Sequence, residues 1–213
     1  MRNITKGEPP ASLVEHRAQE HASYGNYVEK ATLRVCLVRE QRGICCYCMG
    51  PIAPTEEAMK IEHWRPQRDP NYSHLQLVYS NLLGACLGGD GQQDAERHCD
   101  TAKGMLLLSR NPADPAHNVQ ALVHFDATGK ITSPNAAFDD ELNSVLNLNA
   151  AGLKNSRLGQ LRAFQQTLAK RGTLTKKQLI RIYDKWAGIS QTGDLQPYCG
   201  VIVYWVQKRL AKL

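Results

Sequence analysis

The spacing of the cysteines is the feature that most constrains what this chain can fold into. The chain has seven cysteines, and two of them, Cys45 and Cys48, form a C-x-x-C pair in which one turn can place both thiolates on a tetrahedral ion. A second pair, Cys86 and Cys99, flanks a loop rich in glycine and polar residues, with a wider gap than usual. The four thiols predict a closed structural zinc site that stabilises a module with little apolar mass of its own.

Two alternatives for the ligand set stay open. Cys46 competes with its neighbour Cys45, although the two-residue spacer favours Cys45, and His98 is the main rival ligand in the second pair. Cys36 lies on a helical stripe and Cys199 in an apolar run, so we expect both in the core.

The chain has no segment that indicates a membrane or a secretory route. Its longest apolar run, residues 199–206, is far shorter than a membrane span, and the first ten residues hold no apolar stretch of a signal peptide. We therefore expect a cytoplasmic protein without membrane association, in which clustered thiols indicate metal binding rather than disulfides.

The charge is concentrated in the last third of the chain. The formal net charge of the 213 residues is +6, yet residues 1–110 are balanced, with 13 basic and 13 acidic side chains. Residues 152–213 carry twelve Lys and Arg, including Lys170 and Arg171, against Asp184 and Asp194 only. This region is either a surface that faces a polyanion or a set of solvated helical faces.

The periodicity of apolar residues predicts an α+β fold that is mainly helical. Helices are expected over residues 11–22, 27–42, 139–149 and 151–171, then from a cap at Thr173 or Thr175 through Trp186, and finally after residue 197. Residues 121–125 and 130–132 read as a hairpin across a turn. We divide the chain into an N-terminal helical segment (1–42), a cysteine-containing module (43–110) and a basic, mostly helical region (111–213).

Three short motifs between and after the cysteines carry a family resemblance. They are Lys60-Ile-Glu-His-Trp-Arg-Pro66, Tyr79-Ser-Asn-Leu-Leu83 and Asp100-Thr-Ala-Lys-Gly104. With the C-x-x-C pair, their order resembles the HNH endonucleases of the ββα-metal family. The resemblance implies an embedded ββα-metal module and phosphodiester hydrolysis, which needs a base for water, a divalent cation and stabilisation of the leaving oxygen.

The resemblance also implies roles for individual residues. They are His63 as general base, Glu62 and Asp100 as ligands of catalytic Mg²⁺ or Mn²⁺, Asn81 as the amide whose oxygen orients the histidine ring, and Lys103 as a contact to phosphate or to the leaving oxygen. Arg65 could act like Lys103, although a surface arginine is the more ordinary interpretation. The chain departs from the family in the insertion at residues 87–98 and in having Asp100 where His or Asn is usual. Whether Asp100 or His98 completes the catalytic metal site therefore stays open.

A softer resemblance extends over the rest of the chain. Residues 4–13, 33–41 and 145–149, with Leu153 and Arg157, are similar to the PtuB nuclease subunits of Septu-type and retron-associated antiphage systems. This implies a PtuA-like ATPase partner of the ABC/SMC type, a nucleic-acid substrate, and in retron systems a reverse transcriptase with its RNA–DNA product. DNA is the favoured substrate, and host RNA such as tRNA is the alternative.

Two further alternatives remain. The chain could be a zinc-stabilised module that binds nucleic acid or protein without catalysis, in which case Glu62, His63, Asn81 and Asp100 match the family by chance. The basic last third could hold a nucleic-acid backbone, or it could pack on the partner through an apolar stripe formed by Leu161, Phe164 and Leu168.

Overall fold

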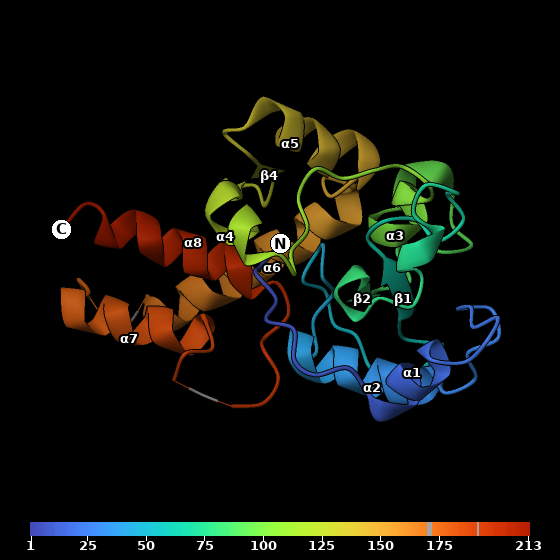
Figure 1. Cartoon of the computed structure of the whole chain (residues 1–213). Helices are drawn as coiled ribbons and strands as arrows, with labels where there is room; N and C mark the ends of the chain where they lie inside the picture. The colour runs from blue at the N-terminus through green and yellow to red at the C-terminus, as the bar shows by residue number, and fades with distance from the viewer. Residues whose placement is uncertain (170–171, 191) are drawn as a thin grey trace.

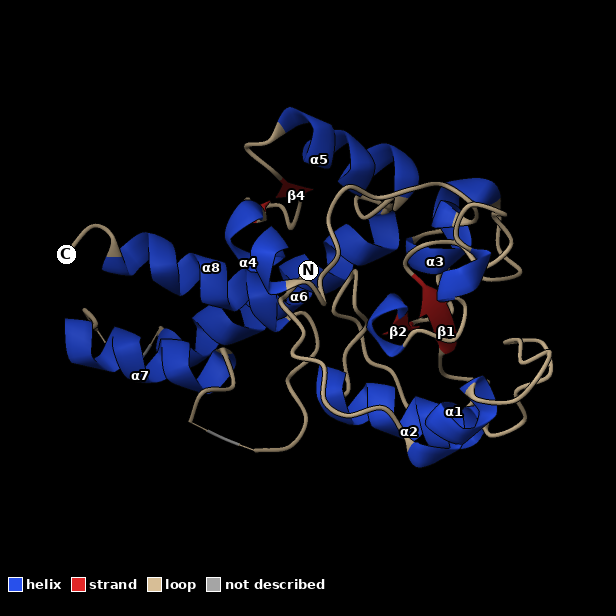
Figure 2. Ribbon diagram, in the orientation of Figure 1, coloured by secondary structure: helices blue, strands red, loops and turns tan. Residues whose placement is uncertain are grey.

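The computed structural model describes residues 1–169, 172–190 and 192–213. Within them the helices are α1 (Ala11–Arg17), α2 (Lys30–Gln41), α3 (Cys99–Lys103), α4 (Val119–Leu122), α5 (Ala136–Asp140), α6 (Ala151–Leu168), α7 (Lys176–Trp186) and α8 (Cys199–Leu210). The strands are β1 (Lys60–His63), β2 (Leu82–Ala85), β3 (His124–Phe125) and β4 (Ile131–Thr132). The prediction of a mainly helical α+β fold is confirmed (Figures 1 and 2).

The two sheets are small antiparallel pairs. β1 pairs with β2 in a register that sets Glu62 opposite Leu83 and His63 opposite Leu82. β3 pairs with β4 across the turn at residues 126–129, so the predicted hairpin is confirmed. Figure 1 shows β1, β2 and α3 grouped on one side of the molecule, with α1 and α2 beneath them and α7 and α8 extending to the far side.

Helix α2 packs against the β1–β2 pair. Leu33 and Leu37, one turn apart on α2, are fully buried, and α2 packs against β2. The helix begins at Lys30, three residues after the predicted start, and it ends at Gln41 because Arg42 and then Gly43 adopt positive φ angles of 54° and 76°. The predicted helix over 11–22 also ends early, at Arg17.

The C-terminal helices form a second packed layer. Thr175 caps α7 in a capping box with Gln178, which confirms one of the two predicted caps. α6 ends at Leu168, and residues 170 and 171 of the helix predicted over 151–171 lie outside the described residues. Residues 139–149 do not form one helix. The side chain of Asn135 starts α5 earlier, and a π-helical turn over Glu141–Val145 follows it.

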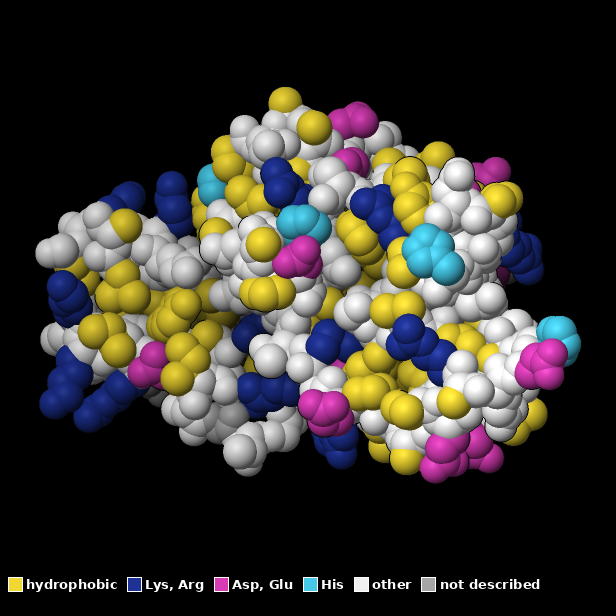
Figure 3. Space-filling model, in the orientation of Figure 1, with side chains coloured by type: hydrophobic (Ala, Val, Ile, Leu, Met, Phe, Trp, Pro, Cys, Tyr) yellow, Lys and Arg dark blue, Asp and Glu magenta, His cyan; other side chains and the backbone are white. Residues whose placement is uncertain are grey.

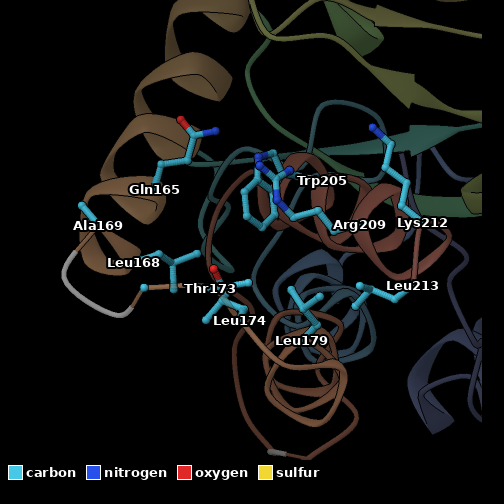
Figure 4. A pocket seen from close by; sticks show the side chains of 11 residues that line it. Gln165, Leu168, Ala169, Thr173, Leu174, Leu179, Trp205, Arg209, Lys212 and Leu213 are labelled. Atoms are coloured by element: carbon cyan, nitrogen blue, oxygen red, sulfur yellow. The ribbon is translucent and has the colours of Figure 1, made fainter.

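The apolar stripe of α6 is covered within the chain, which argues against the alternative that this stripe packs on a partner. Leu161 and Phe164 are buried, because α8 packs along α6 and the Phe164 ring lies 5.4 Å from the Trp205 ring and 5.6 Å from the Trp186 ring. The stripe is therefore part of the core of this lobe. Leu168 lies at its end and lines a pocket of about 590 Å³ among α6, α7 and α8 (Figure 4).

The surface charge follows the asymmetry of the sequence. Figure 3 shows Lys and Arg side chains gathered around the lobe of α7 and α8, and acidic side chains gathered over α1 and α2. Lys170 and Arg171 lie outside the described residues. In the part of the chain that the structure describes, no helix combines the length and apolar character needed to cross a membrane.

Candidate active site

Four thiols meet in one cluster. The sulfur atoms of Cys45, Cys48, Cys86 and Cys99 all lie within 4.8 Å of one another, with Cys45 Sγ 3.9 Å from Cys99 Sγ and Cys48 Sγ 3.7 Å from Cys86 Sγ. In a tetrahedral site with Zn–S bonds of about 2.3 Å the sulfur atoms lie about 3.8 Å apart. The geometry of the cluster therefore fits a Zn²⁺ ion, and the prediction that these four residues come together is confirmed.

The rival zinc ligands take different positions. The backbone N–H of Gly50 donates to Cys48 Sγ at 3.2 Å, while Cys46 is buried outside the cluster. His98 lies at its edge, with Nδ1 3.2 Å from Cys99 Sγ and 4.0 Å from Cys86 Sγ. His98 thus faces the thiols and not the carboxyl groups of the neighbouring cavity.

The thiol cluster positions α3 against the end of β1. Cys99 is the first residue of α3, so the cluster fixes the start of the helix. Asp100 follows it, and Lys103 comes one turn later. Both side chains approach Glu62, the third residue of β1. The cluster thereby joins segments from residues 45 to 99 and holds Asp100 and Lys103 of α3 beside Glu62 of β1.

Glu62 is buried and belongs to a small charged network. Its Oε1 accepts a hydrogen bond from the Tyr47 hydroxyl at 2.7 Å. The same oxygen forms an ion pair with Lys103 Nζ at 2.9 Å. Burial, followed by the neighbouring Asp100 carboxyl, raises the pKa of Glu62 well above its usual value, while Lys103 and Tyr47 oppose that rise. Two adjacent carboxyl groups beside the buried ammonium group of Lys103 could hold a further cation.

Lys103 does not lie where the sequence led us to expect it. The side chain is 1% exposed, and its Nζ contacts Glu62 and donates to the backbone carbonyl of His63 at 3.1 Å. A fully buried ammonium group that is already paired in this way holds α3 to β1. Two cations line the open side of the site, Lys60, which is paired with Asp90, and the more exposed Arg68, which the motifs did not single out.

His63 is held in one tautomer. Its Nε2 lies 3.0 Å from the backbone carbonyl oxygen of Gln76, and because a carbonyl oxygen only accepts, Nε2 carries the proton and Nδ1 keeps a lone pair. Burial lowers the pKa of His63 to about 4, although the Gln76 carbonyl and Asp100 work against that shift. The imidazole is therefore neutral at neutral pH and able to accept a proton.

The expected contact between Asn81 and the histidine ring is wrong. The amide oxygen of Asn81 accepts from the backbone N–H of Arg65 at 2.7 Å, and its NH₂ group donates to the carbonyls of Arg65 and Leu75. Asn81 thus joins both ends of the loop that leads to Gln76, whose carbonyl holds His63. It acts on the ring through the backbone of this loop, a route that a motif cannot indicate.

Tyr24 covers His63 from outside the cysteine module. The Tyr24 ring meets the imidazole edge-on with centroids 4.5 Å apart, and the Tyr24 N–H donates to the Gln76 side chain at 3.0 Å. Burial raises the pKa of Tyr24 to about 12, so the phenol stays neutral. No sequence signal marks Tyr24 or Gln76, whereas Tyr47 stands between two zinc-ligand candidates.

These side chains border one open cavity. The cavity has a volume of about 410 Å³ and is lined by Lys60, Ile61, Glu62, His63, Pro66, Gln67, Arg68, Asp100, Thr101, Gly104 and Met105. The predicted residues Glu62, His63 and Asp100 therefore share one surface, while Asn81 and Lys103 support it from behind. Arg65 is not among the residues that line this cavity, and its guanidinium lies 4.0 Å from the centre of the Trp64 ring.

Comparison with known proteins gives one informative similarity. No protein-family model matches the chain. The chain is similar to the "Retron Ec83 putative HNH endonuclease" of Escherichia coli, with 26% identity over 204 residues that cover 74% of this chain and 78% of that protein. The similarity supports an HNH endonuclease, the class to which the arrangement of His63 and the two carboxyl groups also points.

Proposed function

We propose that this chain is a metal-dependent endonuclease that hydrolyses phosphodiester bonds. The observation that carries the proposal is the meeting of a neutral imidazole, His63, with the carboxyl groups of Glu62 and Asp100 along one cavity. A base and a site for a hard cation are the two groups that phosphodiester hydrolysis requires. The similarity to an HNH endonuclease supports the same conclusion.

The residues divide the chemistry between them. His63 Nδ1 takes a proton from the attacking water, and the Gln76 carbonyl keeps the ring in the correct tautomer. Glu62 and Asp100 are the residues that would hold Mg²⁺ or Mn²⁺, which when bound polarises the phosphoryl oxygen and stabilises the leaving oxygen. We choose Asp100 over His98 because Asp100 lines the cavity and His98 faces the thiols.

Two basic residues have separate tasks in this proposal. Arg68 is exposed on the cavity wall, where its guanidinium can contact the phosphate that enters. Lys103 is a positioning residue, because its buried ammonium group balances Glu62 and ties α3 to β1. The phosphate contact that the family resemblance gave to Lys103 is thereby assigned to Arg68.

We further propose that the four thiolates bind a structural zinc ion. β1, β2 and α3 would then form the ββα-metal arrangement inside a module over residues 43–110, with helical regions at 1–42 and 111–213. The close approach of the four sulfur atoms supports the zinc assignment. Tyr24 contacts the base from outside this module, so the N-terminal region contributes to the site as well.

The biological setting is a proposal of its own. The name of the E. coli relative links that protein to a retron, which supports a role for this chain in a retron-associated defence system. A PtuA-like ATPase partner and a reverse transcriptase with its RNA–DNA product rest on the sequence resemblance alone. DNA is the proposed substrate, and the exposed cations of α7 and α8 would hold either its backbone or the partner.

The test compares two histidine variants. Purified wild-type protein, His63→Ala and His74→Ala are incubated with plasmid DNA and with total tRNA, with and without Mg²⁺. His74 is an exposed histidine of the same loop and serves as the matched control. We expect His63→Ala to be folded, zinc-loaded and inactive, and His74→Ala to cleave like the wild type. Wild-type cleavage rates in His63→Ala would refute the assignment of the base. A wild-type protein that binds nucleic acid and cuts none would favour the non-catalytic module.

A further inference from the structure

The insertion at residues 87–98, where this chain departs from the family pattern, forms a folded loop beside the candidate active site. The N–H of His98 donates to the carbonyl of Gly88 at 2.9 Å, and the N–H of Asp90 donates to the carbonyl of Leu87 at 3.1 Å. Gly88 has a φ of 61°, and a side chain there would collide with the carbonyl oxygen of His98. The loop therefore has a defined shape, and it carries Asp90 at its turn.

This loop places a carboxylate on a cation of the cavity wall. Asp90 Oδ2 lies 3.0 Å from Lys60 Nζ, and the same ammonium group donates to Thr101 Oγ1 at 2.9 Å. Lys60 and Thr101 both line the candidate active-site cavity. The hydrogen bond from Lys60 lowers the pKa of Asp90, so the carboxyl group is ionised at neutral pH. One cation of the site is thus already paired with an anion from the insertion.

Lys60 stands next to the residues proposed to act on the scissile phosphate. It is the first residue of β1 and Glu62 is the third, so both side chains lie on the same face of the strand, with Cα atoms about 7 Å apart. A nucleic-acid strand whose phosphodiester lies at Glu62 and His63 must continue past this point. The next phosphate of that strand therefore passes close to the Lys60 ammonium group.

The partner of Lys60 can be exchanged at low cost. The side chains of Lys60 and Asp90 are 30% and 59% exposed, and an ion pair in contact with water contributes little to stability. A phosphate oxygen accepts the same charge-assisted hydrogen bond as a carboxylate oxygen. The Thr101 hydroxyl continues to hold the ammonium group while the anion changes.

We propose that Lys60 binds the backbone phosphate next to the scissile one, and that Asp90 occupies this subsite until the nucleic acid displaces it. The inference rests on the proposed nuclease function. It applies to DNA and RNA alike, because both carry the same backbone phosphate. The inserted loop therefore competes with a polymeric substrate and not with a small phosphodiester that carries a single phosphate.

The test compares Asp90→Asn, Lys60→Gln and their combination. Binding of a labelled DNA oligonucleotide is measured in an inactive His63→Ala background at several salt concentrations. Cleavage of the same oligonucleotide and of bis(p-nitrophenyl) phosphate is measured in the active protein. The matched control is Asp94→Asn, which removes the same charge from the same loop but breaks an exposed pair with Arg97. Lys60→Arg is a second variant that keeps the cation.

We expect Asp90→Asn to tighten oligonucleotide binding about threefold, because the phosphate no longer displaces a carboxylate. Lys60→Gln should weaken binding about tenfold and lower the slope of log K against log salt by about one, the change expected for one lost phosphate contact. Lys60→Arg should retain most of the affinity. In the Lys60→Gln background, Asp90→Asn should have no further effect, because Asp90 acts through Lys60. Asp94→Asn should bind like the wild type.

Four results would overturn the proposal. Equal gains in Asp90→Asn and Asp94→Asn would show a general effect of charge, and an unchanged salt slope in Lys60→Gln would remove the phosphate contact. A gain from Asp90→Asn that persists without Lys60 would give Asp90 another partner. An equal loss of kcat/KM on the small ester and the oligonucleotide in Lys60→Gln would make Lys60 a support of the cavity. If the wild type cleaves neither substrate and His63→Ala binds no nucleic acid, the nuclease function itself fails, which is a different outcome.

Discussion

The backbone carbonyl of Gln76 lies 3.0 Å from Nε2 of His63 and fixes the tautomer of the proposed base. The side chain of the same residue accepts the N–H of Tyr24 at 3.0 Å, and the Tyr24 ring packs against the imidazole. Gln76 therefore connects the base to the N-terminal segment. The orientation of His63 therefore depends on the loop that follows β1 and on the N-terminal segment that holds Tyr24.

Removing the side chain of Asn81 should make the position of His63 less well defined, although the two side chains are linked only through the backbone of the loop. In Asn81→Ala the N–H of Arg65 and the carbonyl of Leu75 lose their partner, so we expect a loss of about 1–3 kcal/mol in stability and a fall of about 10–100-fold in cleavage rate. Urea unfolding and plasmid cleavage measure the two effects. Asn71→Ala, at an exposed position of the same loop, is the control and should leave both near wild type. Wild-type activity in Asn81→Ala would contradict the proposed route to His63.

The stability of the protein should depend on His63 below neutral pH. Its pKa is lowered from 6.5 to about 4 in the folded state, so between these values the unfolded chain binds a proton that the folded chain does not. The contribution is fully present above pH 6.5 and is lost as the pH falls toward 4. From pH 7.5 to pH 5 the loss amounts to about 2 kcal/mol.

Urea unfolding of the wild type and of His63→Gln at both pH values isolates this contribution, because other groups that titrate in the same range are common to both proteins. We expect the wild type to lose more stability than the variant on acidification. An identical pH dependence in the two proteins would show that His63 is not buried as a neutral ring.

The ion pair between Glu62 and Lys103 should show strong coupling. Lys103→Met leaves a carboxyl group without its buried partner, so we expect a loss of about 3 kcal/mol at pH 7.5. Adding Glu62→Gln removes the remaining charge and should recover part of that loss. Arg97→Met, which breaks an exposed pair with Asp94, should cost less than about 1 kcal/mol. Urea unfolding of the wild type, Lys103→Met, Glu62→Gln, the double variant and Arg97→Met measures the coupling, and additive losses at positions 62 and 103 would argue against a buried pair.

Zinc should be present in stoichiometric amount and should stabilise the fold. We expect one zinc per chain in protein purified without chelator, and its loss with unfolding of the cysteine module in Cys48→Ser, because a structural zinc site can contribute ~10 kcal/mol or more. Cys36→Ser, at a partly exposed thiol outside the cluster, is the control and should retain the metal. Elemental analysis and thermal unfolding provide the measurements. Full thermal stability of Cys48→Ser would count against a structural role for the cluster.

Local patterns predicted the parts of the molecule that local forces decide. The hairpin at residues 124–132 and the cap at Thr175 follow from turn and capping chemistry within a few residues. The C-x-x-C pair indicated a metal cluster, and the motif order placed Glu62, His63 and Asp100 together, as the cavity now shows. The apolar stripe of α6 was also read correctly as apolar. The sequence did not indicate that α8 buries this stripe, because α8 begins some thirty residues later in the chain.

The sequence by itself determined the chemistry of the side chains: four thiols for a soft ion, two carboxyl groups and an imidazole for hydrolysis, and a basic last third. Only the tertiary structure decided how these groups are used. In the folded chain the Asn81 amide binds the backbone of a loop, and Lys103 is buried against Glu62. Tyr24 and Gln76 both contact His63. The physical reason is that protonation state and tautomer depend on burial and on hydrogen bonds across long sequence separations. Spacing along a chain does not encode them.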